Sequence, residues 1–189
     1  MVHLIYNESA DVWYSLLLKF KKIFLKGGAD RMKHTLPALL FSFLKLSAFL
    51  DSGNSINAPP QTNDEDAVQV IKVDHAKIFK SVNEIILALQ EHSAEQCLKL
   101  YLQAAQAVNN LRNFHPCEDM AYEFMSQALL IYQDEISDAD AKTSAINLIC
   151  STMYYLNCFS EENHNTLIAN TLSSCAQLLK KPQQCEAII

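Results

Sequence analysis

Two histidine–cysteine combinations in this chain of 189 residues carry side chains that could do chemistry. His115 and Cys117 are separated only by Pro116, which is not the ligand spacing of a zinc finger, and no second pair follows. Cys158 and His164 could supply a nucleophile and its base, but no third group that would orient the base is apparent. We therefore interpret these residues as parts of turns and helix ends, and predict neither a metal site nor a catalytic pair.

Acidic residues at two other places could act as general acids or bind cations. Glu161 and Glu162 fall in the first turn of a predicted helix, where carboxylates complement the helix dipole, so dipole compensation is the simpler interpretation. A second cluster surrounds a turn and is interpreted as solvated surface, with a calcium or partner site as the alternative. Its members are Asp134, Glu135, Asp138 and Asp140. The chain is predicted to be no enzyme and to bind no cofactor.

Composition excludes several function classes. Half of the residues are hydrophobic, but only three are glycine and five are proline. That is too few for the turns of a β-sandwich or for a glycine-rich phosphate loop. The 15 basic and 21 acidic residues give a net charge of −6, whereas nucleic-acid-binding domains normally carry a basic surplus.

The cysteines and the apolar segments indicate the compartment. The six cysteines are widely spaced and several fall on apolar helical stripes, which predicts buried free thiols in a reducing compartment. The first residues lack the pattern of a signal peptide. The most apolar stretch, residues 36–50, is shorter than the roughly 20 residues of a spanning helix and contains Lys45. We expect a soluble, cytoplasmic protein.

Apolar residues recur at three- and four-residue intervals, which predicts an all-α fold. Gly27 and Gly28 are expected to end the first helix in the left-handed conformation. Thr35 is expected to cap the second helix, with Pro37 in its first turn. Ser93, Ser137 and Ser160 are expected to cap the fourth, sixth and seventh helices. The expected helices lie at about 11–26, 35–50, 68–91, 94–112, 118–135, 138–157 and 161–180, with partial helices at 1–5 and 183–189.

Helix length and loop length together predict an α-solenoid of HEAT-like antiparallel helical hairpins. No repeat consensus is visible, and a globular bundle would give a similar pattern. Partial helices at both ends favour a piece of a longer stack. We expect residues 1–189 to form one such unit, interrupted by a flexible loop at 51–66 that holds a glycine, two prolines, three asparagines and four acids.

The candidate binding residues lie outside the main apolar stripes of the fourth and sixth helices. In a solenoid the second, fourth and sixth helices occupy equivalent places on one side. Mixed stripes on that side predict either a partner groove or packing onto neighbouring repeats. We expect Leu102 to be an apolar anchor outside the core, surrounded by polar neighbours. The candidates are Leu102, Gln103, Gln106, Asn110, Asn147 and Tyr154.

Three segments of the chain carry a family resemblance. AYEFMSQALLIYQDEIS at 121–137, CFSEENH at 158–164 and LLKKPQQ at 178–184 resemble the vacuolar protein sorting-associated protein 35 family, the large helical subunit of the retromer complex. Weaker matches in the same order are GGADRMKHTLPALLF at 27–41 and LKLYLQAA at 98–105. The loop at 51–66 departs from the family in length and composition.

The resemblance implies an α-solenoid from the C-terminal half of that subunit. It further implies a non-enzymatic scaffold that holds vacuolar protein sorting-associated protein 29, a metallophosphoesterase-fold subunit, against its concave side. Other retromer subunits would bind through parts outside this chain. Membrane association would be peripheral, on endosomes, for transport to the Golgi or the plasma membrane. The alternatives are a helical interaction module of another trafficking or transport assembly and a regulatory helical domain of an enzyme.

Overall fold

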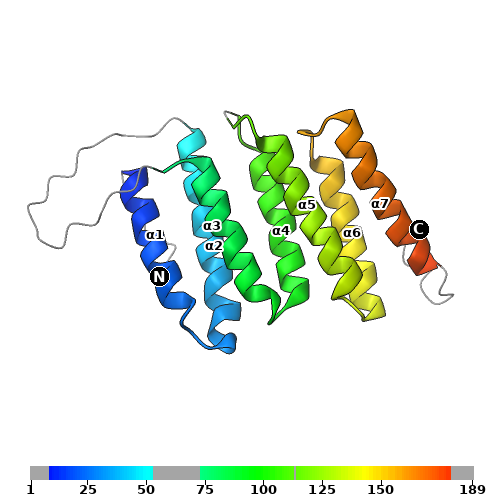
Figure 1. Ribbon diagram of the computed structural model, residues 1–189, viewed down its shortest axis with the longest axis horizontal. Coiled ribbons are helices and arrows are strands. Elements are labelled where there is room, and N and C mark those ends of the chain that lie inside the picture. Colours follow the sequence, from blue (N-terminus) through cyan, green and yellow to red (C-terminus); the bar gives the residue numbers. More distant parts are fainter. Residues whose placement is uncertain (1–8, 53–72, 113, 180–189) are drawn as a thin grey trace, which may run out of the picture. The chain divides into compact units, whose positions relative to one another are not determined.

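The computed structural model describes residues 9–52, 73–112 and 114–179, which form seven α-helices and contain no strand (Figure 1). The all-α prediction is therefore confirmed. The chain divides into two compact units, residues 1–92 and 93–189. No helix among the described residues is long and apolar enough to cross a membrane. The helices are α1 (Ala10–Phe24), α2 (Ala29–Asp51), α3 (His75–Gln90), α4 (Ala94–Asn109), α5 (Cys117–Asp134), α6 (Ala139–Tyr155) and α7 (Glu161–Leu179).

In the first unit, α2 packs against both α1 and α3. Its apolar face is fully buried and includes Leu39, Leu40 and Phe43. Polar contacts also join α1 to α3, because the Tyr14 hydroxyl donates to the Lys77 carbonyl at 3.3 Å. The buried side of α1 therefore combines apolar and polar residues, which a purely apolar stripe does not predict.

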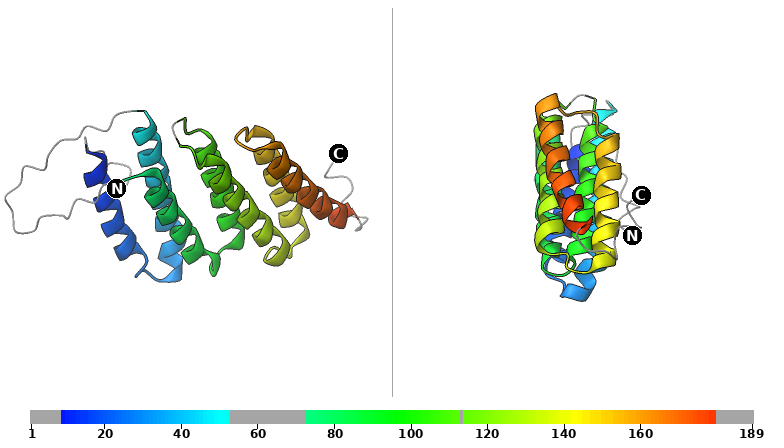
Figure 2. Two further views of the ribbon diagram at one scale, coloured as in Figure 1. Left: turned by 45° about the horizontal axis from the view of Figure 1, so that its top comes forward. Right: turned by 90° about the vertical axis from the view of Figure 1, so that its right-hand side faces the viewer.

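In the second unit the helices form two layers. The α4–α5 hairpin is the most extensive contact, and α4 also packs on α6 while α5 also packs on α7. Figure 2 shows α6 and α7 on opposite sides of this arrangement. Each hairpin thus contributes one helix to each layer, which is the packing expected of HEAT-like antiparallel hairpins. The predicted equivalence of α4 and α6 is confirmed; α2 belongs to the other unit.

The start of α2 was predicted wrongly. The helix begins at Ala29 and not near Thr35, after Gly28 in an extended conformation (φ −66°, ψ 162°). Thr35 lies inside the helix, where its hydroxyl donates to the Arg31 carbonyl at 2.9 Å. Pro37 therefore also lies inside the helix. The segment before Thr35 contains Met32, which is buried, so packing extends the helix past the expected cap.

Other helix ends differ from the prediction in their capping groups. Gly28 has a negative φ and no positive φ occurs at Gly27, so the left-handed ending of α1 is wrong. Ser93 precedes α4 without a side-chain capping bond, and α6 is capped by Asp138 in place of Ser137. Ser160 does accept from the Asn163 amide at 3.5 Å, as expected for the start of α7.

Several predicted segments lie outside the described residues. These are both terminal partial helices, the beginning expected for the third helix, and most of the loop at 51–66. Of that loop, Asp51 closes α2 and Ser52 follows it. The helix α3 begins at His75, where the Asp74 carboxylate accepts from the Lys77 amide at 2.7 Å.

Candidate protein-binding groove

A hollow of about 380 Å³ lies between α4 and α6, in the second unit. Its α4 side contains Lys99, Leu102, Gln103 and Gln106, and its α6 side contains Leu148, Ser151, Thr152 and Tyr155. Three of the six predicted candidates thus meet in one depression. A fourth, Asn110, lines an adjoining hollow of about 380 Å³ with Gln106, Asn109 and Tyr155.

Leu102 lies on the floor of this hollow and is not the exposed anchor that we expected. Its side chain is only 3% exposed. The helix α4 packs on α5 along one face and on α6 along another. The apolar stripe read from the sequence accounts only for the face of α4 that packs on α5. The expectation that Leu102 lies outside the core is therefore wrong, because the second neighbour covers it.

The polar candidates on α4 lie where a partner could reach them. Gln103 and Asn110 are exposed, while Gln106 is half-buried. The Gln106 side-chain amide donates to the Thr152 hydroxyl at 3.5 Å and so links the two walls. The rim of the hollow therefore offers amide groups above an apolar floor.

The candidates on α6 do not line the hollow. Asn147 is exposed, and Tyr154 is 82% exposed. The next residue along the chain takes the place of each, because Leu148 and Tyr155 form the wall. Successive residues of an α-helix are rotated by about 100°, so the predicted groove face of α6 is wrong by one residue. The Tyr154 ring packs edge-on against the ring of Tyr155, with centroids 5.5 Å apart, but does not itself line the hollow.

The missed residues share a recognisable spacing. Leu148, Thr152 and Tyr155 follow one another at intervals of four and three residues, the period of a helix face. The signal is weak because Ile146 and Ile149 form a second, more deeply buried apolar stripe on the same helix. The groove residues remain more accessible, with Leu148 40% and Tyr155 66% exposed.

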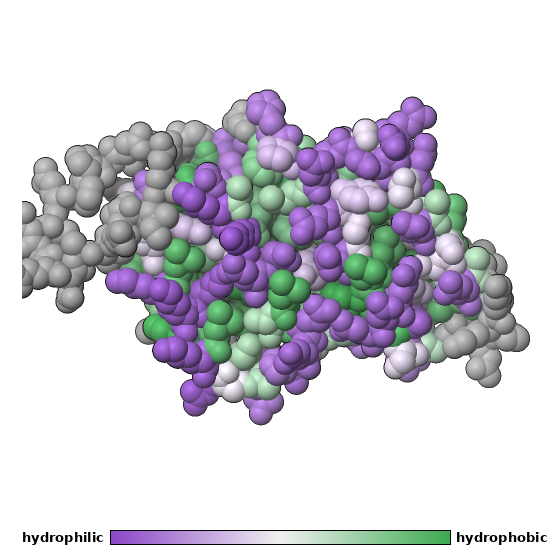
Figure 3. Space-filling model, viewed as in Figure 1, coloured by the Kyte–Doolittle hydropathy of each residue, from purple (hydrophilic) through white to green (hydrophobic). Residues whose placement is uncertain are grey.

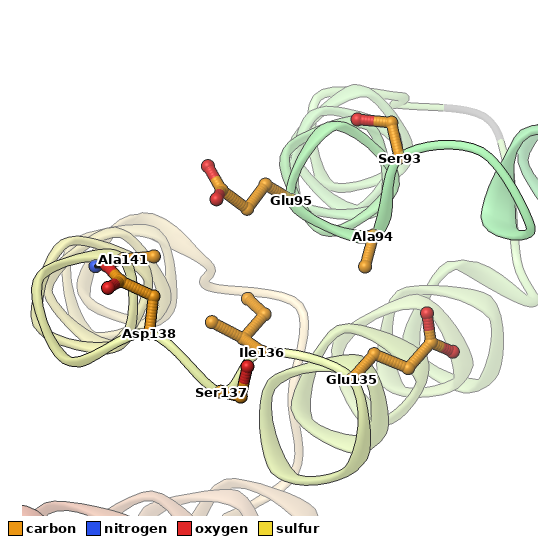
Figure 4. Close-up of a pocket in the computed structure, with 8 residues that line it drawn as sticks. All are labelled: Ser93, Ala94, Glu95, Glu135, Ile136, Ser137, Asp138 and Ala141. Atoms are coloured by element: carbon orange, nitrogen blue, oxygen red, sulfur yellow. Dashed lines mark hydrogen bonds between the residues drawn. The ribbon is translucent and has the colours of Figure 1, made fainter.

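A third hollow, of about 370 Å³, lies where α4 and α6 begin (Figure 4). Its lining residues include Glu95, Glu135 and Asp138, and Figure 4 shows the Glu95 and Glu135 carboxylates pointing in opposite directions. Two members of the predicted acidic cluster, Glu135 and Asp138, therefore line the same hollow as Glu95 of α4. Asp138 also accepts from the Ala141 amide at 2.9 Å and so caps α6. Within the described residues, no three histidine, cysteine or acidic side chains form a group that could hold a metal ion.

These hollows follow one another between α4 and α6 and share lining residues. A small recess of about 30 Å³ shares Glu95 and Ala141 with the acidic hollow, and shares Lys99 and Leu148 with the central one. Gln106 and Tyr155 connect the central hollow to the last one. The residues from Glu95 to Asn110 on α4 and from Ala141 to Tyr155 on α6 that line these hollows are called the α4/α6 groove. At 1.5 Å per residue, its length is about 24 Å.

The thiols do not form a nucleophilic site. Among the described residues, Cys97, Cys117, Cys150, Cys158 and Cys175 are free thiols. Of these five only Cys97 is buried and the others are half-buried, so the prediction that the cysteines are chiefly buried is wrong. Burial raises the pKa of Cys158 to about 12, with a further contribution from Cys117. A thiol with such a pKa is almost entirely protonated near neutral pH and is a poor nucleophile.

The layered hairpins define the class of the chain, which is an α-helical hairpin-repeat protein. The family model for vacuolar protein sorting-associated protein 35 matches residues 1–189, and the chain belongs to that family. It is 36% identical over 189 residues to vacuolar protein sorting-associated protein 35A of Arabidopsis thaliana, covering 100% of this chain and 22% of the relative.

Two further relatives give the same result. Vacuolar protein sorting-associated protein 35C of Arabidopsis thaliana is 34% identical over 100% of this chain and 22% of its own length. Vacuolar protein sorting-associated protein 35 of Dictyostelium discoideum is 29% identical over 100% of this chain and 23% of its own length. The chain therefore spans less than a quarter of the relatives that it matches, and the predicted family membership is confirmed.

Proposed function

We propose that this chain is part of the non-enzymatic scaffold of a retromer-type sorting coat. Membership of the vacuolar protein sorting-associated protein 35 family supports this proposal over another trafficking module or an enzyme's regulatory domain. The coat would act in the cytoplasm and lie peripherally on endosome membranes. Its role would be transport from endosomes to the Golgi or the plasma membrane.

The α4/α6 groove is the surface we assign to the partner, vacuolar protein sorting-associated protein 29. The observation that carries this assignment is the meeting of four predicted candidates, Leu102, Gln103, Gln106 and Asn110, along one groove. Its partly exposed apolar residues, Leu148 and Tyr155, lie among amide side chains. An apolar centre with polar neighbours is the usual arrangement of an interface hot spot.

Titration calorimetry of the full-length protein against that metallophosphoesterase-fold subunit tests the assignment. Leu148→Asp should weaken binding by about 2 kcal/mol, or roughly 30-fold, because the charge must be desolvated within the interface. Leu130→Asp on α5 is the matched control, since Leu130 is 49% exposed and lies in the other layer. Unchanged affinity of the Leu148 variant, with weaker binding of the Leu130 variant, would move the partner to the opposite layer.

The other layer of the second unit also carries exposed apolar side chains. In the view of Figure 3 apolar side chains are interspersed with hydrophilic ones. The exposed leucines of that layer, Leu130 on α5 and Leu172 on α7, line none of the four hollows described here. Scattered exposed leucines are ordinary for a protein surface.

A further inference from the structure

Cys117 and Cys158 belong to two different histidine–cysteine combinations in the sequence, but the fold brings their thiols together. A hydrogen bond joins the two side chains. Cys117 is the first residue of α5, and Cys158 lies in the connection between α6 and α7. A second pair of thiols, Cys150 on α6 and Cys175 on α7, is also joined by a side-chain hydrogen bond. The second unit therefore holds two pairs of neighbouring thiols.

Independent contacts hold Cys117 and Cys158 near each other. The side-chain oxygen of Asn109, at the end of α4, accepts the Cys158 amide at 3.1 Å and fixes the connection there. Glu118, which follows Cys117, accepts the Ser160 amide at 2.7 Å. The chain segments that follow the two cysteines are thus hydrogen-bonded to each other. The proximity of the two thiols does not depend on their own rotamers alone.

The two thiol pairs differ in the backbone that carries them. A disulfide has an S–S bond of about 2.05 Å, so thiols that are only in hydrogen-bond contact must move closer to form one. Cys117 begins a helix, where the amide has no intrahelical partner, and Cys158 lies in a connection. Cys150 and Cys175 lie within helices, where the same movement would disturb intrahelical hydrogen bonds and packing. The first pair is therefore the one that can close at lower cost.

The first pair is also within reach of a small oxidant. Both side chains are half-buried, and the neighbouring residues Pro116 and Asn157 are exposed. Hydrogen peroxide is small and uncharged, so neither partial burial nor the negative charge of Glu118 excludes it. A peroxide can therefore reach sulfur atoms that already lie side by side.

We propose that Cys117 and Cys158 are an oxidation site, at which hydrogen peroxide forms a reversible disulfide between the start of α5 and the α6–α7 connection. This proposal goes beyond the proposed function and does not rest on it. The disulfide would add a covalent bond to the hydrogen bonds that already hold the connection. Thiol–disulfide exchange with a small thiol such as glutathione would restore both cysteines.

The reaction has two steps. The Cys117 thiolate attacks one oxygen of hydrogen peroxide, the O–O bond breaks, and the other oxygen leaves as hydroxide, which takes up the thiol proton to give water. The Cys158 sulfur then attacks the sulfenic acid, an S–S bond forms, and the sulfenic hydroxyl leaves with the Cys158 proton as a second water. The two thiols lose two electrons and the peroxide gains them.

The order of the steps follows from the environment of Cys158. Burial raises the pKa of Cys158 to about 12, which keeps this thiol protonated, so Cys117 is assigned the first attack. Cys158 needs to react only with a sulfenic acid that is held beside it. The pair is thus a site of modification and not a catalytic site.

Peptide mapping of the full-length protein tests the proposal. Native protein is treated with hydrogen peroxide, blocked with N-ethylmaleimide and digested with trypsin and chymotrypsin, which cut between all four cysteines. Peptides joined through Cys117 and Cys158 should appear, and dithiothreitol should separate them. They should be about tenfold more abundant than peptides joined through Cys150 and Cys175, because closing the second pair strains two helices. Protein oxidised in denaturant should lose this preference.

Three outcomes of the mapping would overturn the proposal. One is the absence of a cross-link between Cys117 and Cys158 in the native protein. Another is a cross-link through Cys150 and Cys175 that predominates. The third is a cross-link between two protein molecules, seen as a dimer on a non-reducing gel.

Serine variants test the order of the steps and the directness of the reaction. In Cys158→Ser the Cys117 sulfenic acid has no partner and should be trapped by dimedone, whereas Cys117→Ser should give about a tenth of that labelling at Cys158. Equal labelling would overturn the assigned order. Cys175→Ser is the matched control, because it removes one thiol of the other pair and should leave the cross-link at its usual level. Loss of the cross-link in this control would contradict a direct reaction between Cys117 and Cys158.

Discussion

The two units use their polar side chains differently. In the first unit an ion pair joins α1 and α3, whereas in the second unit an asparagine and a glutamate hold the connection between α6 and α7 by hydrogen bonds. The Lys21 ammonium group of α1 contacts the Glu84 carboxylate of α3, and Lys21 is only 8% exposed. In the second unit Asn109 and Glu118 accept backbone amides of the α6–α7 connection. The first unit therefore pairs one buried ammonium group with a carboxylate, whereas in the second unit a carboxylate and an amide hold a surface connection.

The carboxylates Glu84 and Glu95 differ in the same way. A carboxylate that neutralises a buried ammonium group is committed to holding the fold, as Glu84 is. Glu95 at the groove end is exposed and projects from the first turn of α4, where its charge can meet a partner.

The largest effect is expected at the floor of the groove. Leu102→Asp should destabilise the protein by about 3 kcal/mol or more, because it places a charge among apolar residues at a position that is 3% exposed. Leu148→Asp, at 40% exposure on the facing wall, should cost less than about 1 kcal/mol. Thermal unfolding followed by circular dichroism measures both. Equal losses would show that Leu102 and Leu148 are equally buried in solution.

A smaller effect is expected at the ion pair of the first unit. Glu84→Ala leaves the Lys21 ammonium group between α1 and α3 without that carboxylate and should cost about 1–2 kcal/mol, less than for a fully buried pair because the Glu84 side chain is 49% exposed. Lys21→Met removes the buried charge and should restore most of the loss in the double variant. Chemical denaturation measures the four proteins as a cycle. A double variant less stable than Glu84→Ala would contradict this account.

Glu118 should make the stability of the second unit depend on pH. Its carboxylate accepts the Ser160 amide and the Asn163 side-chain amide, both at 2.7 Å. Hydrogen bonds from Ser160 and then Asn163 lower the pKa of Glu118. The pKa of Glu118 is therefore lower in the folded protein than in the unfolded chain. Its contribution to the free energy of unfolding is fully present above the unfolded pKa and is lost as the pH falls through the folded pKa.

The variant Glu118→Gln keeps an acceptor but cannot titrate. Its melting temperature should fall less steeply than that of the unaltered protein as the pH is lowered from 6 toward about 3. Asp119→Asn, at the exposed neighbouring position, is the matched control. If the melting temperatures of the Glu118 variant and the unaltered protein fell in parallel, the hydrogen bonds from Ser160 and Asn163 would not depend on the charge of Glu118.

The sequence predicted the layers of the second unit better than it predicted the groove between its helices. The apolar residues of α5, including Phe124 and Met125, recur at helical spacing and are buried as expected. Periodicity reveals such a face because a single neighbour, α4, dominates the packing. The groove depends on α4 having a second neighbour, α6, and no local pattern states which helices will meet. Leu102 was therefore wrongly expected to lie outside the core, and Tyr155 was missed.

Capping positions were also harder to predict than helix faces. A threonine with a proline two residues later favours a helix start, yet α2 begins six residues before Thr35. A capping bond is typically worth about 1 kcal/mol, and burial of one apolar side chain such as Met32 contributes about 1.5–3 kcal/mol. The larger contribution extends the helix. The acidic hollow was partly predicted, because Glu135 and Asp138 belong to the cluster recognised in the sequence, but Glu95 is brought to it only by the fold.

The smallest effect is expected from modification of the thiols, and it also distinguishes the units. All six cysteines of the chain lie in the second unit. Burial raises the pKa of Cys97 to about 12, as it does for Cys158, and Glu135 adds to the shift at Cys97. At pH 8 only about one such thiol in 10⁴ is ionised, and the thiolate is the reacting form.

Native protein treated briefly with iodoacetamide at pH 8 should therefore be alkylated slowly at Cys97 and Cys158, and Cys97 should be the slower because it is the more buried. Unfolding in denaturant should bring both to the rate of an ordinary thiol. Peptide mass spectrometry with and without a reducing agent measures the modification and shows whether the thiols are free. Rapid labelling of Cys97 in the native protein would mean that the α4–α5 interface opens readily. A mass that changes on reduction would show that thiols of the second unit form disulfides.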